Sequence, residues 1–186
     1  MNQLYRSRVR TIEGFSEWTR GFLARDYEVY FVNFMFKRLL RRHSHFSDPM
    51  EDEACRVYQT LVTRVVREPR KHLDLLPVYF GCPDFPVWKS DKISPVDFSI
   101  NDGRHWNGLY FIPPVSRLTC DLDEHFEENR KLYLKPDRPL QRIHTTRMIH
   151  GDMTDYALKA FKNGRAKHDN ILVLPRALSE LDSRIS

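Results

Sequence analysis

The chain is poor in cysteine and glycine, and both shortages exclude whole classes of protein. Its three cysteines, Cys55, Cys82 and Cys120, are odd in number and widely spaced, so they predict neither a disulfide framework nor a CxxC zinc pair. Only seven glycines occur, and none stands in a GxxxxGK or GxGxxG pattern. A nucleotide-driven motor is therefore not expected.

Long apolar stretches are also missing. No run approaches the ~20 residues that span a bilayer, and the polar, basic residues 1–10 do not resemble a secretion leader. The 186 residues are 41% hydrophobic and 30% charged, the balance of one folded domain. The composition predicts an intracellular, cytoplasmic protein with no membrane partner, and its net charge of +5 admits a polyanion such as nucleic acid.

Hydrophobic periodicity predicts alternating strands and helices. Strands are expected at 29–36, 75–82, 105–112 and 142–150, and helices at 13–25, from Ser47 or Asp48 to about 68, at 121–134, and from Asp152 or Thr154 to 161. The apolar run at 29–36 predicts a central strand buried on both faces. Asp152 or Thr154 is expected to cap the last helix, and Gly164 is expected just after its end. This order of strands and helices favours an α+β fold of the split βαβ kind, an antiparallel sheet with helices packed on one face, as in ferredoxin-like and RRM-like domains. We expect an N-terminal helical arm (1–26), a main domain (27–175) and a C-terminal tail (176–186).

The predicted strand 105–112, HWNGLYFI, carries a candidate metal site. Side chains alternate between the faces of a strand, so His105 and Asn107 project to the same side. Imidazole nitrogen and amide oxygen can both coordinate Mg²⁺ or Mn²⁺ if a carboxylate or phosphate completes the shell. An isolated His-x-Asn is more often a pair of ordinary polar residues near a strand end.

Tyr156 and Lys159 lie three residues apart on the last predicted helix and are therefore neighbours on its surface. A tyrosinate can attack a phosphodiester, and a nearby cation can stabilise the charge that develops. The alternative is that Tyr156 is a core residue, because it belongs to an apolar stripe with Met153, Ala157, Ala160 and Phe161. A nucleophile facing a metal on the sheet would lie beside that same inward stripe.

These motifs together resemble replication initiators of the HUH endonuclease class with a single tyrosine. HWNGLYFI resembles the second motif of that family, DYALKAFKNG its YxxK motif, and YFVNFMF stands where the first, apolar motif belongs. The resemblance covers residues 27–164, in the family's order. Asn107 departs from the family, which has His or Gln there. Asp84, Asp91 and Asp97 are candidates for the third ligand, and Asp84 is preferred because it follows the second strand most closely.

The resemblance implies metal-assisted nicking and rejoining of single-stranded DNA through a 5′-phosphotyrosine on Tyr156, assisted by Lys159. It implies His105, Asn107 and Asp84 as ligands of Mg²⁺ or Mn²⁺. The expected partner is single-stranded DNA or an origin hairpin, and the lack of a helicase module suggests a plasmid- or phage-type initiator of rolling-circle replication or mobilisation that uses a host helicase. The residues expected to contact nucleic acid are Arg104, Lys162, Arg165 and Lys167.

Two other interpretations remain open. A non-catalytic binding module could use the same sheet, with Trp106, Tyr110 or Phe111 stacking on bases. A third-ranked alternative is a 2H phosphoesterase, because His45-Phe46-Ser47 and His144-Thr145-Thr146 match its H-x-[ST] pattern. The literal HxH at 43–45 is predicted to be a solvated loop that contacts phosphate at most.

Overall fold

The computed structural model describes residues 3–37, 47–84, 104–148 and 152–176. They form a five-stranded antiparallel sheet with the strand order β4-β1-β3-β2-β5. The strands are β1 (Glu28–Phe36), β2 (Val78–Asp84), β3 (His105–Ile112), β4 (Leu140–Arg147) and β5 (Leu172–Leu174). The predicted α+β class with an antiparallel sheet is confirmed. Strand β5 was not predicted, because three residues are too few to show a period.

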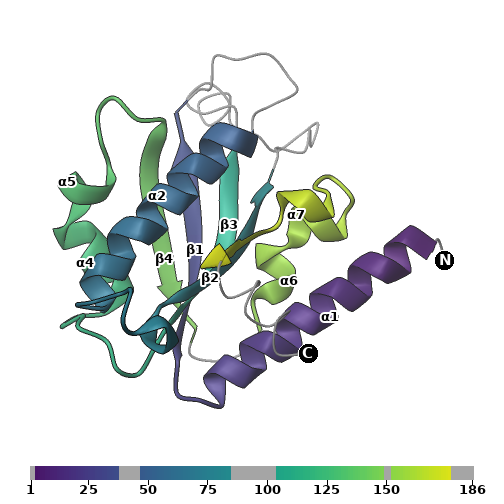
Figure 1. Cartoon of the computed structure of the whole chain (residues 1–186). Coiled ribbons are helices and arrows are strands. Elements are labelled where there is room, and N and C mark those ends of the chain that lie inside the picture. The colour runs from purple at the N-terminus through teal and green to yellow at the C-terminus, as the bar shows by residue number, and fades with distance from the viewer. Residues whose placement is uncertain (1–2, 38–46, 85–103, 149–151, 177–186) are drawn as a thin grey trace.

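Helices cover both faces of the sheet, and not one face alone (Figure 1). On one side lie α2 (Ser47–Val65), α4 (Leu122–Glu128) and α5 (Arg130–Tyr133), and on the other α1 (Gln3–Leu23), α6 (Thr154–Ala157) and α7 (Lys159–Lys162). Short 3-10 turns occur at Leu73–Leu75 and His168–Asn170. The expectation of a single covered face was wrong because helical periodicity shows that a helix has an apolar side and does not show which sheet face that side meets.

The central strands β1 and β3 contribute to two separate cores. On β1, Tyr30, Val32 and Phe34 pack beneath α2 and α4, whereas Val29 and Phe31 pack on the opposite side. Burial on both faces explains why this strand reads as a nearly continuous apolar run, as the sequence predicted.

Helix α1 is longer than predicted and is part of the second core. Its aromatic side chains pack on the sheet, with ring centroids 4.6 Å apart for Phe22 and Phe111 and 4.6 Å apart for Phe15 and Phe80. Burial of such side chains stabilises the fold by about 1.5–3 kcal/mol each. The second half of α1 is thereby fixed across the sheet, while its first turns extend beyond it (Figure 1).

Candidate nuclease site on the sheet

The register of the sheet arranges the side chains of the second face in rows across the strands. Residues paired across antiparallel strands project to the same face, so each row can be taken directly from the pairing. We call them the first row (Arg142, Met35, His105, Asp84), the second row (His144, Asn33, Asn107, Cys82) and the third row (Thr146, Phe31, Leu109, Phe80). The third row is mainly apolar, and the first two carry most of the polar groups.

Asp84, His105 and Asn107 form a hydrogen-bonded cluster at the boundary between the first and second rows. Asp84 Oδ2 lies 3.4 Å from His105 Nε2, and Asn107 Nδ2 donates to the same oxygen at 3.5 Å. Asn33 Nδ2 donates to Asn107 Oδ1 at 2.7 Å. Asp84 therefore lies directly across from His105, whereas Asp91 and Asp97 lie outside the described residues.

Asp84 is nearly buried, with 6% of its surface exposed, and basic groups converge on it. Arg165 Nη1 lies 3.0 Å from Asp84 Oδ1. Burial raises the pKa of Asp84, but the hydrogen bond and charge of His105 and the charges of Arg165 and Lys159 outweigh it and lower the pKa below its usual value. The carboxylate is therefore ionised at neutral pH. Arg165, expected to contact nucleic acid, is engaged here with Asp84.

This donor set is compatible with a divalent cation. Two ligands that are each about 2.1 Å from a metal lie about 3.0–3.4 Å apart, depending on geometry. The observed separation of Asp84 Oδ2 and His105 Nε2 falls in that range. A half-turn of the Asn107 amide would direct its oxygen toward the same point. In the described part of the chain no cluster of three or more His, Cys, Asp or Glu forms a metal site, and Asn107 is the further donor placed beside Asp84 and His105 there.

Tyr156 lies at the edge of the second core and is exposed over 47% of its surface. Its ring packs edge-on against Phe31 of the third row, with centroids 5.2 Å apart. Of the apolar stripe, Ala157, Ala160 and Phe161 are buried instead. The interpretation of Tyr156 as a core residue is therefore wrong.

Lys159 lies next to Tyr156, with its Nζ 5.5 Å from the centre of the tyrosine ring. The predicted single helix is divided into α6 and α7 by Leu158, whose backbone (φ −102°, ψ 21°) departs from helical values. The charge of Lys159 also contributes to lowering the pKa of Asp84, so this ammonium acts on that carboxylate as well as contacting the tyrosine ring.

Two buried contacts hold this segment on the sheet. The thiol of Cys82 in the second row donates to the Ala157 carbonyl at 3.5 Å, and burial, the largest influence, raises its pKa to about 12. At the other end, Thr154 Oγ1 lies 3.1 Å from Thr19 Oγ1 of α1. Asp152 Oδ1 accepts from the Thr154 amide at 2.8 Å, but the residue that caps α6 is Met153 and not the predicted Asp152 or Thr154. Gly164 has φ +73°, which agrees with its predicted place after the helix.

The β4 side of this face adds polar groups that the sequence analysis did not place in the site. Arg142 and His144 are exposed and stand in the first and second rows, beside Met35 and Asn33. Asn33 could have been noticed as the one polar residue in YFVNFMF. Arg142 and His144 could not, because their position depends on the pairing of β4 with β1. His45, which the 2H phosphoesterase alternative requires as the partner of His144, lies outside the described residues, as does the HxH at 43–45.

The remaining predicted nucleic-acid contacts differ in their surroundings. Lys167 is exposed, Arg104 is partly buried just before β3, and Lys162 forms an ion pair with Asp155.

The prediction that aromatic residues of β3 stack on bases, which the binding-module alternative requires, is wrong. Trp106, Tyr110 and Phe111 are fully buried in the two cores, so none of them can stack on a base.

No protein-family model, curated protein or solved structure matches the chain. Among the helices described, none is both long enough and apolar enough to cross a membrane.

Proposed function

We propose that the protein nicks and rejoins single-stranded DNA through a covalent bond to Tyr156, with a divalent cation held by Asp84, His105 and Asn107. The observation that carries this proposal is the exposure of Tyr156 on the same sheet face as the Asp84–His105 pair, with Lys159 beside it. Taken alone, each of these side chains has an ordinary structural explanation. Tyr156 and Lys159 are exposed and His105 is partly exposed on this face, whereas Asp84 and Asn107 are buried beneath them, with 6% and 1% of their surface exposed. Their position on one face gives them a common chemical use.

In this proposal a single strand lies along the open part of the face, over the second row. Its scissile phosphate would lie above Asn33, which is partly exposed in the second row, between the cation ligands of the first row and Tyr156 above the third row. Mg²⁺ or Mn²⁺ would withdraw charge from the phosphate oxygens. Arg142 and His144 would position the neighbouring phosphates.

The reaction is a transesterification. The Tyr156 oxygen forms a bond to phosphorus, the bond from phosphorus to the 3′ oxygen breaks, and a 5′-phosphotyrosine and a free 3′-hydroxyl result. The phenol proton passes to water at this exposed side chain, and the 3′ oxygen takes up a proton from water. Lys159 supplies positive charge beside the developing phenolate. Attack by a 3′-hydroxyl reverses the step and rejoins the strand, as initiation of rolling-circle replication or mobilisation requires, with unwinding by a host helicase.

The test is whether the protein forms a covalent adduct with DNA that survives denaturation in SDS. The protein is incubated with labelled single-stranded DNA and Mn²⁺, and the adduct is expected with the wild type and absent in Tyr156→Phe. Tyr5→Phe is the matched control, because Tyr5 is also an exposed tyrosine near α7, and it should retain the adduct. Adduct formation by Tyr156→Phe would falsify the assignment of the nucleophile.

A non-catalytic nucleic-acid binder is the second candidate, and the Arg165–Asp84 ion pair favours it. A carboxylate already neutralised by a guanidinium has less need of a metal. Under this alternative no adduct forms with any metal, and Asp84→Asn leaves DNA binding unchanged. The nicking proposal predicts instead that Asp84→Asn abolishes the adduct.

A further inference from the structure

The basic excess of the chain is concentrated in two segments. Residues 3–11 and 157–168 contain seven basic side chains and no Asp or Glu. The remainder of the chain has 23 Lys and Arg against 25 Asp and Glu, a net charge of −2, whereas the whole chain carries +5. The seven are Arg6, Arg8, Arg10, Lys159, Lys162, Arg165 and Lys167, of which Lys162 is paired with Asp155 and Arg165 with Asp84.

These two segments, distant in sequence, pack together. The Arg8 guanidinium lies where a side chain at Gly164 would be, 2.4 Å from the position of its Cβ. Thr11 Oγ1 lies 3.2 Å from His168 Nε2. We call the combined surface of residues 3–11 and 157–168 the basic platform. It begins at the residue after Tyr156 and ends at the projecting first turns of α1 (Figure 1).

The side of α1 opposite Arg8, which faces away from residues 157–168, has the composition of a phosphate-binding surface. Gln3, Arg6, Ser7 and Arg10 follow one another at intervals of three, one and three residues, so they share one side of the helix. Gln3, Arg6 and Arg10 are exposed, and among the described residues no carboxylate pairs with either arginine. From residue 3 to residue 10 the helix rises about 10 Å, about three base-pair steps of a duplex.

We propose that the basic platform binds the phosphate backbone of double-stranded nucleic acid, alongside the single-strand site at Tyr156. A duplex is favoured over a single strand because this side of α1 offers guanidinium, amide and hydroxyl groups, with none of the stacked aromatic rings that single-strand binding uses. A membrane is disfavoured because an interfacial helix needs a free apolar face. The apolar face of α1 is packed on the sheet through Phe15 and Phe22, and the exposed Leu4 and Tyr5 of its first turns are too few to form such a face.

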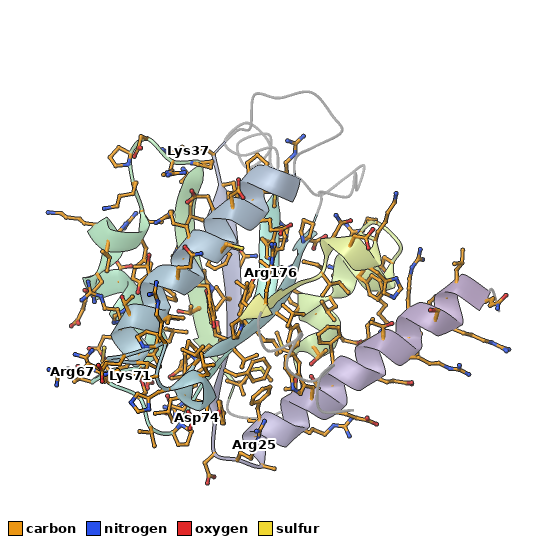
Figure 2. All side chains as sticks on the ribbon, viewed as in Figure 1. Arg25, Lys37, Arg67, Lys71, Asp74 and Arg176 are labelled. Carbon is orange, nitrogen blue, oxygen red and sulfur yellow. The ribbon has the colours of Figure 1, made fainter. Side chains whose placement is uncertain are left out.

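The test compares two variants that each remove two positive charges. Arg6→Gln/Arg10→Gln changes the platform, and Arg67→Gln/Arg70→Gln changes an exposed region beyond α2, away from the first turns of α1 (Figure 2). Binding to a labelled 20-base-pair duplex is measured by anisotropy from 50 to 200 mM salt. The platform variant should bind about tenfold more weakly, and its slope of log affinity against log salt should fall by about 2. The control should change less than about twofold.

Further variants separate the possible outcomes. Arg6→Lys/Arg10→Lys keeps the charges and should restore most of the affinity. Equal weakening in the platform and control variants would overturn the proposal, as would a loss confined to single-stranded DNA. So would binding of wild type to phosphatidylserine vesicles with no duplex binding at the same salt concentration. Tyr156→Phe should retain duplex binding while losing the adduct, so the two proposals can fail separately.

Discussion

The two faces of the sheet are built from the same strands and have opposite properties. On the face beneath α2 and α4, Tyr79, Trp106 and Tyr110 are fully buried, and burial raises the pKa of Tyr79 and Tyr110 well above the usual value for tyrosine. On the other face, α1, α6 and α7 cover the β2 and β3 side, while Arg142 and His144 on β4 remain exposed. One strand, β3, contributes its alternate residues to a sealed core and to a partly open polar site.

This difference shows how a small domain can combine stability and chemistry. The sealed face supplies the burial that holds the strands in register, and the register in turn sets the distance from Asp84 to His105. Functional groups held on strands are more precisely positioned than groups on loops. The two faces should therefore respond differently to substitution at neighbouring residues.

The largest difference in the free energy of unfolding is expected between Trp106→Ala and His105→Ala. These substitutions change adjacent residues of β3 that lie on opposite faces of the sheet. Removing the buried indole should lower the free energy of unfolding by about 3–5 kcal/mol. His105→Ala should cost about 1 kcal/mol or less and should abolish the DNA adduct. Urea denaturation and the adduct assay, run on both variants, measure the contrast. A similar loss of stability in the two variants would show that the faces are not separable in this way.

A smaller difference in the free energy of unfolding is expected between phenylalanine substitutions of two tyrosines, one buried and one exposed. The Tyr133 hydroxyl lies 2.8 Å from His125 Nε2 within the sealed core, so Tyr133→Phe should lower the free energy of unfolding by about 1–3 kcal/mol, because His125 is left without its partner. Tyr156→Phe removes a hydroxyl from an exposed side chain and should change stability by less than about 0.5 kcal/mol. Chemical denaturation of both variants tests this, and a larger effect at Tyr156 would contradict it.

The smallest expected effect is on the pH dependence of the free energy of unfolding. Burial, followed by the charge of Arg64, lowers the pKa of His125 below 6.5, against a smaller opposing effect of Glu128. The folded state therefore binds fewer protons than the unfolded state, so this contribution to stability is complete above pH 6.5 and is lost as the pH falls through the folded pKa. His125→Gln should flatten the pH dependence of unfolding in that range. His144→Gln, at an exposed residue of the other face, should leave it in place; equal flattening by both substitutions would exclude His125 as the cause.

The sequence by itself determined the features that depend on neighbours along the chain. Alternation on HWNGLYFI places His105 and Asn107 on one face, and a continuous apolar run identifies β1 as a buried central strand. The left-handed Gly164 after the last helix was likewise predicted, because a terminating glycine lies within a few residues of the turn that it ends. Whether the cluster binds a metal and whether Tyr156 reacts with DNA both stay predictions.

The tertiary structure decided what depends on long-range pairing. The pairing of β2 with β3 brings Asp84 opposite His105, and the pairing of β4 with β1 adds Arg142 and His144 to the same face. Periodicity could not decide whether Tyr156 was buried, because a residue at the edge of an apolar stripe is covered only if a neighbouring element reaches it. The packing of residues 3–11 against 157–168 also joins segments about 150 residues apart, a contact that no local pattern encodes.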